Sequence, residues 1–242
     1  MEYYSESILR CLKNGGEKMG VFLILLDAFS YKYINPRSTP FLFEILKAGN
    51  LRGLEPLFAF MGIEATIFSG EWPFTHNVWT EFKLKTKNLD RSSDKLLSAG
   101  IGFLDNLKNE NVSKLARLLF IMTSNVSLTR LTPNMIPPGL LPCFEPSMKK
   151  SIMHPAALNV STIFDWLRFK KKKFICIKPA APLKNDLATV EQAKRVILHK
   201  KPTFAWVKLN SLDKAGHTYG PNLSMLREDL ARTDALVEDL TN

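Results

Sequence analysis

The stretch MGVFLILLDAF, Met19 to Phe29, contains a continuous apolar run that ends in a single carboxylate, Asp27. An apolar run without polar alternation predicts a strand buried on both faces, as in a parallel sheet. The segment STPFLFEILKAGN follows, where a Ser-Thr pair can cap a helix, Pro40 suits its first turn and Gly49 ends it. Strand, loop and helix in this order indicate the first unit of an α/β fold.

Further along the chain, strand-like and helix-like segments alternate in the same way. Residues 51–57 predict a short second strand, and GIEATIFSGEWP predicts a helix that is stopped by Gly70 and Pro73. The remaining predicted elements are a helix with Ile163, Trp166 and Leu167 on one face, the strand FICIKP, the helix DLATVEQAKRVILHK, the strand TFAWVKLN and the helix LSMLREDLARTDALVEDL. We therefore expect an α/β fold with a mainly parallel sheet flanked by helices.

Residues 88–155 interrupt this alternation. Helical stretches such as SKLARLLFIM are followed there by the proline-rich segment TPNMIPPGLLPCFEP, and no strand pattern is evident. We interpret residues 88–155 as a helical cap inserted into one α/β domain that spans residues 1–242.

Charge and cysteine content restrict the classes of partner and compartment. The net charge is +10, and the densest basic run is RFKKKKF, Arg168 to Phe174. We interpret this run as a solvated turn between a helix and a strand, and a contact for an anionic partner is the alternative. We expect no specific nucleic-acid binding, because basic and aromatic residues do not alternate as they do in single-strand binders. The three cysteines are odd in number and unevenly spaced, so they do not indicate a disulfide framework, and this favours a reducing compartment.

The N-terminal segment lacks the features of a targeting sequence. It is polar before its first apolar run, which is the wrong order for a secretory signal, and VFLILLDAF is too short to span a bilayer. The sequence predicts a cytoplasmic protein without a membrane span.

A candidate site comes from the residues that follow two of the predicted strands. Asp27 follows the first apolar run, while Asp213 and His217 follow the strand TFAWVKLN, in a segment whose glycines and proline predict a loop. Ligands bind at the carboxyl ends of parallel strands, and carboxylate and imidazole groups suit a divalent cation. The alternatives are that Asp27 caps a turn and that His217 is an ordinary hydrogen-bonding residue.

Three blocks of the chain resemble a known family. The similarity is to ordered blocks of the alkaline phosphatase superfamily. The three blocks are VFLILLDAFSYKYI with STPFLFEILKAGNLRGLEPLFAF, then ATIFSGEWPFTHNVW, and finally SLDKAGHTYGP. They resemble most the branch of type I phosphodiesterases and nucleotide pyrophosphatases. The middle of the chain is unmatched, as the cap region of that family would be.

The resemblance implies an alkaline-phosphatase-like fold and a metal-dependent hydrolase of phosphate esters or related small molecules. It implies two divalent metal ions, with zinc as the expected metal. Asp27 resembles the ligand of one ion, and Asp213 and His217 resemble ligands of the other. The alternative is a non-catalytic or truncated relative that acts as a binding or assembly module.

The chain departs from the family at the nucleophile. The family places a Thr or Ser at the start of the helix in FMGIEATIFSG, and counting back from Gly70 puts that position at Phe60, which has no hydroxyl. Thr66 is the fallback nucleophile, although Thr66 and Ser69 lie inside the helix, where capping or back-bonding is the commoner role. His76 matches a position that is structural in the family.

The family also completes its metal site with a later Asp-His-Gly block, and the sequence contains none. We therefore expect the sequence to be the N-terminal part of a longer protein or a truncated homologue. These 242 residues alone are expected not to hydrolyse phosphodiesters at a useful rate.

Overall fold

The computed structural model describes residues 10–11, 20–49, 57, 60–85, 136–137, 140, 143–179, 185–220 and 222–241. The chain divides into two compact units, one formed by Met1–Glu55 with Leu167–Asn242 and the other by Pro56–Trp166. Apart from Leu57, the predicted strand over residues 51–57 lies outside the described residues, as does most of the predicted insertion.

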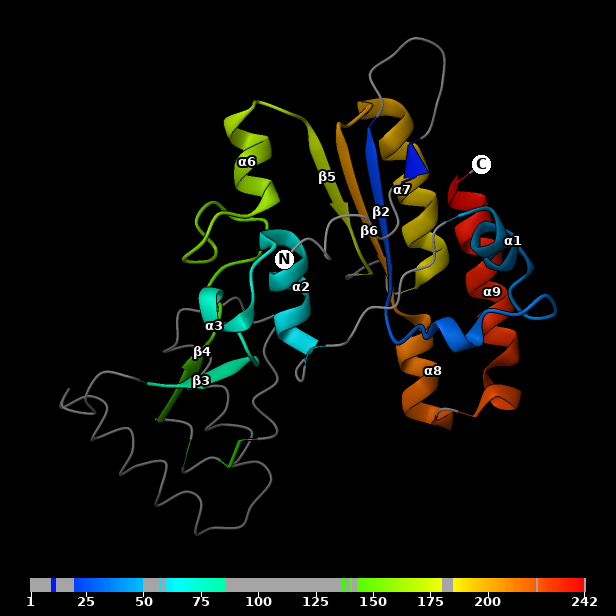
Figure 1. Ribbon diagram of the computed structural model, residues 1–242, viewed down its shortest axis with the longest axis horizontal. Coiled ribbons are helices and arrows are strands. Elements are labelled where there is room, and N and C mark those ends of the chain that lie inside the picture. Colours follow the sequence, from blue (N-terminus) through cyan, green and yellow to red (C-terminus); the bar gives the residue numbers. More distant parts are fainter. Residues whose placement is uncertain are drawn as a thin grey trace. The chain divides into compact units, whose positions relative to one another are not determined.

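The first unit is built on a four-stranded sheet with the strand order β1-β2-β6-β5 (Figure 1). β1 pairs antiparallel with β2, whereas β2, β6 and β5 run parallel to one another. The strands are β1 (Arg10–Cys11), β2 (Val21–Leu26), β5 (Phe174–Ile177) and β6 (Phe204–Leu209). The helices are η1 (Tyr31–Tyr33), α1 (Pro40–Ala48), α7 (Asp186–Lys200), α8 (Ser211–Tyr219) and α9 (Leu223–Thr241). The predicted mainly parallel sheet with flanking helices is confirmed.

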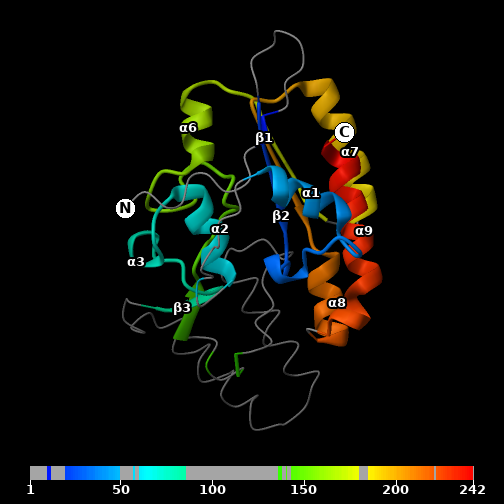
Figure 2. The ribbon, with the colours of Figure 1, turned by 45° about the vertical axis from the view of Figure 1, so that its right-hand side comes forward.

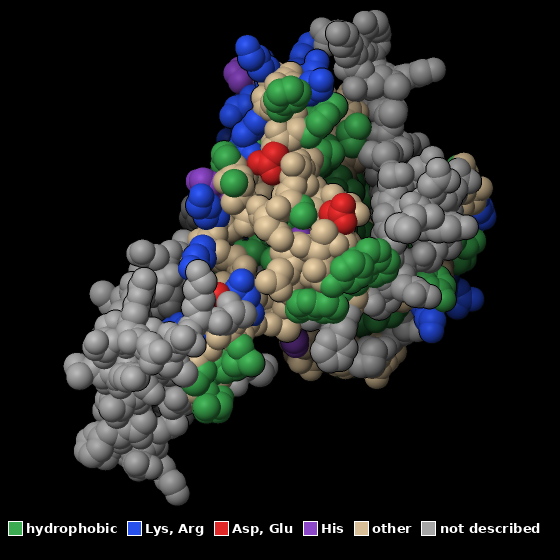
Figure 3. All heavy atoms as spheres, turned by 60° about the vertical axis from the view of Figure 1, so that its left-hand side comes forward, with side chains coloured by type: hydrophobic (Ala, Val, Ile, Leu, Met, Phe, Trp, Pro, Cys, Tyr) green, Lys and Arg blue, Asp and Glu red, His purple; other side chains and the backbone are tan. Residues whose placement is uncertain are grey.

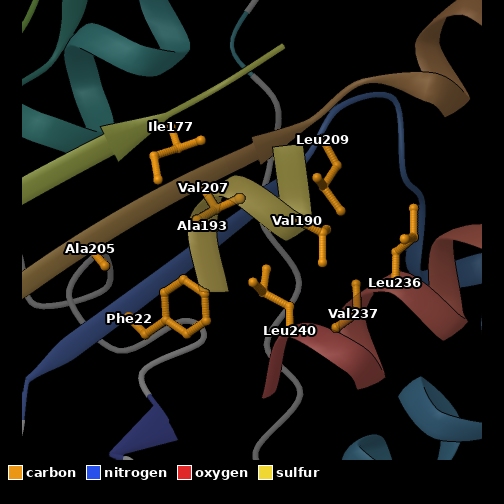
Figure 4. Close-up of a cluster of buried hydrophobic side chains, with 10 residues drawn as sticks. All are labelled: Phe22, Ile177, Val190, Ala193, Ala205, Val207, Leu209, Leu236, Val237 and Leu240. Carbon is orange, nitrogen blue, oxygen red and sulfur yellow. The ribbon is translucent and has the colours of Figure 1, made fainter. Parts of the chain in front are cut away.

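The core of this unit lies between the sheet and two helices that cover one of its faces, α7 and α9 (Figures 1 and 2). Strand residues meet helix residues there in one buried apolar cluster (Figure 4). Its members are Phe22, Ile177, Val190, Ala193, Ala205, Val207, Leu209, Leu236, Val237 and Leu240. β6 is buried along most of its length, whereas β2 is mostly half-buried, so β2 is less buried than its apolar sequence predicted.

In two helices of this unit, backbone N–H groups at the N-terminus donate hydrogen bonds to a buried carboxylate of another helix. Asp234 of α9 accepts hydrogen bonds from the backbone N–H groups of Phe41 (2.9 Å) and Leu42 (2.8 Å) in the first turn of α1. Asp186 of α7 accepts in the same way from Asn210 (3.1 Å) and Ser211 (2.8 Å) at the start of α8. Because the first N–H groups of a helix have no partner within the helix, these carboxylates satisfy donors that burial would otherwise leave unpaired.

The second unit contains α2 (Phe60–Ser69), α3 (Pro73–His76) and a separate antiparallel pair, β3 (Phe82–Leu84) and β4 (Phe144–Pro146). β4 belongs to the stretch predicted as a helical cap, and it pairs with β3 rather than with the sheet of the first unit. Among the described residues, no helix is both long and apolar enough to cross a membrane.

Helix α6 (Ile163–Phe169) corrects one prediction of the sequence. Phe164 is fully buried, with its ring centroid 4.8 Å from that of Phe68, and Leu167 is buried as well. Trp166, which the sequence analysis placed on one face with Leu167, is 54% exposed. Residues three apart share a helix face, so Phe164 and Leu167 mark the buried side.

The buried carboxylate of Asp234 should matter more to stability than an exposed carboxylate on the same helix. Asp234→Ala leaves two backbone N–H groups without their acceptor, and we expect it to lower the free energy of unfolding by about 2–4 kcal/mol. The control is Asp239→Ala, which removes an exposed ion pair with Lys194 and should cost less than about 1 kcal/mol. Urea unfolding of both variants measures the difference, and equal costs would contradict the capping role.

Candidate active site at the carboxyl edge of the sheet

The carboxyl ends of β2 and β6 bring together the chain segments that carry the predicted site. Leu26 is paired with Leu209, so the two neighbouring strands end level with each other. The backbone N–H of Asp27 donates to the carbonyl of Leu209 (2.9 Å), and α8 begins two residues after Leu209. Asp27 and helix α8 therefore leave the same edge of the sheet from adjacent strands.

Residues 211–219 form helix α8, so the prediction of a loop around Asp213 and His217 was wrong. The buried Asp186 accepts hydrogen bonds from the backbone at the start of α8, which gives the helix an N-terminus despite the glycine in its interior. Gly220, at φ 65°, ends it and donates its N–H to the carbonyl of Gly216. The glycine at 220 therefore terminates the helix rather than preventing it.

The helix places Asp213 and His217 one turn apart on the same face. Asp213 Oδ1 lies 3.6 Å from His217 Nε2, and the two side chains are 45% and 82% exposed. A carboxylate and an imidazole at this spacing can both bind one divalent cation from solvent.

Asp27 has a different partner. Its Oδ2 lies 2.8 Å from the Nζ of Lys208, a residue of β6 whose side chain is only 19% exposed. The ammonium group neutralises the carboxylate that the sequence assigned to a metal ion. Within the described part of the chain, no three His, Cys, Asp or Glu side chains are grouped so that they could hold one ion. The described residues thus fit a two-ligand site at Asp213 and His217, and they do not fit a complete two-metal centre.

A pocket is lined by sequence neighbours of Asp27, Asp213 and His217 rather than by these residues themselves. Its lining comes from the β2–η1 connection, η1, α8, the turn after α8 and α9, namely Ala28, Tyr33, Leu212, Gly216, Gly220 and Leu226. Ala28 follows Asp27 directly and has a positive φ of 58°, which is uncommon for a residue with a Cβ. Strained backbone of this kind recurs at functional sites, so this position supports a role for the edge.

The second unit contains the residues related to the nucleophile. α2 begins at Phe60, so the position where the family carries its hydroxyl does lie at a helix N-terminus, but it is occupied by phenylalanine. Ser69 Oγ donates to the carbonyl of Ala65 (2.6 Å), which is the back-bonding predicted for it. Thr66 is buried, and its Oγ1 lies 3.0 Å from His76 Nε2.

His76 is held by two hydrogen bonds that define its tautomer. Its Nδ1 accepts from the backbone N–H of Val78 (3.2 Å), so in the neutral ring Nε2 carries the proton and donates to Thr66 Oγ1. A ring in this state cannot take a proton from Thr66. Burial lowers the pKa of His76, and the nearby negative charge of Glu71 opposes part of that effect. These contacts favour the structural role expected for His76, and they argue against activation of Thr66 by this histidine.

Two important residues were missed by the sequence analysis. Lys208 is the one charged residue within the apolar run FAWVKL, and a lone charge in a buried strand is a signal that it has a partner. Asp186 gave no such signal, because a carboxylate in the first turn of a helix is already explained by its own helix.

Comparison with known families gives one match. Residues 21–242 match the sequence profile of the family described as type I phosphodiesterase / nucleotide pyrophosphatase. No curated protein shows a significant match. The matched range includes Asp27, α8 and the segment that holds Phe60.

The buried His76 should remain neutral to a lower pH than an imidazole in water. We expect the pKa of His76 to lie below its ordinary value of 6.5. Unfolding then takes up a proton, so His76 makes the protein less stable as the pH falls below about 6.5. NMR titration of the imidazole resonances tests this. Glu71→Gln should lower the pKa of His76 further. A pKa of His76 at or above 6.5 would contradict the assignment.

Proposed function

Because the chain belongs to the type I phosphodiesterase / nucleotide pyrophosphatase family, we propose that it is a metal-dependent hydrolase of phosphate esters, with its site at the carboxyl edge of the first unit. The observation that carries the proposal is the level ending of β2 and β6, which puts Asp27 and the Asp213–His217 pair after adjacent strands. Open parallel sheets bind ligands at this edge.

Asp213 and His217 are the proposed ligands of one divalent cation, with zinc as the favoured ion because it accepts both oxygen and imidazole nitrogen. Such a cation polarises a phosphoryl oxygen and lowers the pKa of bound water. Asp27 is the proposed ligand of a second cation, which would compete with Lys208 for the carboxylate. With Lys208 in place, Asp27 is held in a fixed position next to the pocket.

We propose that water, rather than a side chain of this protein, is the nucleophile. Phe60, at the position where the family carries its nucleophile, has no hydroxyl. The hydroxyl of Ser69 donates a hydrogen bond to the carbonyl of Ala65 in the same helix. Thr66 is buried and accepts a hydrogen bond from His76, which leaves its oxygen poorly placed to attack a substrate.

A second candidate is a non-catalytic family member that binds a phosphate-containing or carbohydrate ligand. The ion pair between Asp27 and Lys208 favours it, because a fixed internal ammonium group can replace a metal ion as a structural counter-charge without supporting catalysis. Phenylalanine at the nucleophile position favours it as well.

Zinc binding tests the proposed ligands directly. We expect isothermal titration calorimetry to detect one zinc ion per chain, with the affinity at least about tenfold weaker in Asp213→Asn and in His217→Ala. His199→Ala is the matched control, since His199 is exposed on α7 of the same unit and should leave the affinity unchanged. Equal zinc affinity in the wild type and both ligand variants would remove Asp213 and His217 from the site.

Hydrolysis separates the two candidate functions. With zinc or manganese and a chromogenic phosphodiester, we expect the 242-residue chain to turn over no faster than its Asp213→Ala variant, because the described groups give one ion only two protein ligands. If a longer form of the protein supplies further metal ligands, its turnover in the same assay should depend on Asp213 and His217. Zinc binding at Asp213 and His217 without any turnover in such a form would support the non-catalytic candidate.

A further inference from the structure

The amino edge of the sheet, opposite the candidate site, carries two lysine-rich turns. One is the connection from α6 to β5, with Lys170–Lys173, and the other is the end of α7 with its connection to β6, where Lys200 and Lys201 lie. The backbone N–H of Thr203 donates to the carbonyl of Lys173 (2.8 Å), which fixes the two turns side by side. The sheet thus joins two basic segments that are well separated in sequence.

These turns form one exposed cationic surface. All six lysines are exposed, and neither of the two segments, 167–174 and 198–204, contains an acidic residue. We call this the amino-edge surface and define it by Phe169, Lys170–Lys173, Leu198, Lys200 and Lys201. The turn predicted for RFKKKKF is confirmed, but the sequence did not reveal that a second basic turn lies next to it.

Two large apolar side chains stand among the lysines. Phe169 is 78% exposed and Leu198 is 74% exposed. The Nζ of Lys170 lies 5.2 Å from the ring centroid of Phe169. In Figure 3, Lys and Arg side chains surround exposed hydrophobic ones at the upper end of the molecule, where α6 ends. Lysines around exposed apolar residues are typical of proteins that bind a membrane surface without spanning it.

The backbone at two of these lysines adds an independent argument. Lys171 has a φ of 52° and Lys201 a φ of 43°, so both adopt the left-handed conformation that ends a helix. Glycine is usual there because a Cβ makes this conformation unfavourable. A lysine at the helix C-terminus also interacts well with the helix dipole, but that interaction does not require the left-handed position itself. Lysine at both positions therefore puts a positive charge where glycine is more usual.

We propose that the amino-edge surface docks the protein on an anionic phospholipid surface. Each lysine close to such a surface adds attraction to the negative headgroups, and the apolar side chains enter the boundary between headgroups and acyl chains. A nucleic acid fits less well, because single-strand binders present stacked aromatic side chains along a groove and this surface offers a single aromatic ring.

Docking in this way orients the first unit. Because β2, β5 and β6 are parallel, their amino ends meet at the docked edge and their carboxyl ends lie at the other. Asp27 and α8 would then face away from the lipid, open to water. The proposal concerns a different surface from the candidate site and does not depend on the proposed hydrolase activity.

The test uses substitutions that should weaken vesicle binding without lowering the free energy of unfolding. Lys171→Gly with Lys201→Gly relieves two left-handed positions, so the free energy of unfolding should rise or stay unchanged. Binding to phosphatidylcholine vesicles that contain phosphatidylserine, measured by co-sedimentation of the full chain, should fall by about tenfold or more. The control is Lys32→Ala with Lys214→Ala, which removes two exposed charges elsewhere in the same unit and should change binding less than twofold.

Further measurements separate the contributions of charge and of apolar side chains to vesicle binding. Vesicles of phosphatidylcholine alone should bind weakly, and added salt should weaken binding to the anionic vesicles. Phe169→Ser with Leu198→Ser keeps the charge and should still reduce vesicle binding severalfold. Equal binding by the Lys171/Lys201 variant and the wild type would overturn the proposal. So would tight binding to a single-stranded oligonucleotide without binding to anionic vesicles.

Discussion

The buried carboxylate of Asp186 is the interaction on which the geometry of the candidate site depends. It belongs to the first turn of α7 and accepts two hydrogen bonds at the start of α8, so it lies near the N-termini of both helices. Partial positive charge at both helix ends favours a negative group there. This one carboxylate fixes where α8 begins after β6, and hence where Asp213 and His217 lie relative to the sheet. Asp234 performs the same role between α9 and α1.

The candidate site has two different parts: a carboxylate and an imidazole that suit a metal cation, and a carboxylate that is already paired with a lysine. Asp213 and His217 are exposed and share a helix face, whereas Asp27 is paired with the partly buried ammonium group of Lys208. A metal ion at Asp27 has to compete with an internal charge whose position the sheet register holds, since Lys208 pairs with Leu25, two residues before Asp27. The two parts of the candidate site therefore differ, and the Asp213–His217 pair is the more exposed part.

Parallel strands give the first unit two chemically different edges. The carboxyl edge holds Asp27, Asp213 and His217 beside a small pocket, while the amino edge holds exposed lysines with Phe169 and Leu198. Because β2, β5 and β6 run in the same direction, these two groups of residues lie a strand length apart. The separation allows one edge to bind a surface and the other to bind a small ligand without steric conflict.

The sequence by itself determined β2, β5, β6 and several helices, and it placed Asp27 and the segment of Asp213 at the carboxyl ends of strands. Apolar runs in β2 and β6 and the proline that opens α1 are local signals, and each predicted its element correctly. Tertiary structure decided the rest. Around Asp213, local glycines predicted a loop, but the segment is a helix whose first backbone N–H groups donate to Asp186, 25 residues before Ser211. The pairing of Asp27 with Lys208, and of one lysine turn with the other, depends on which strands become neighbours. Strand order follows from the burial of the whole sheet, and that is a property of no single segment.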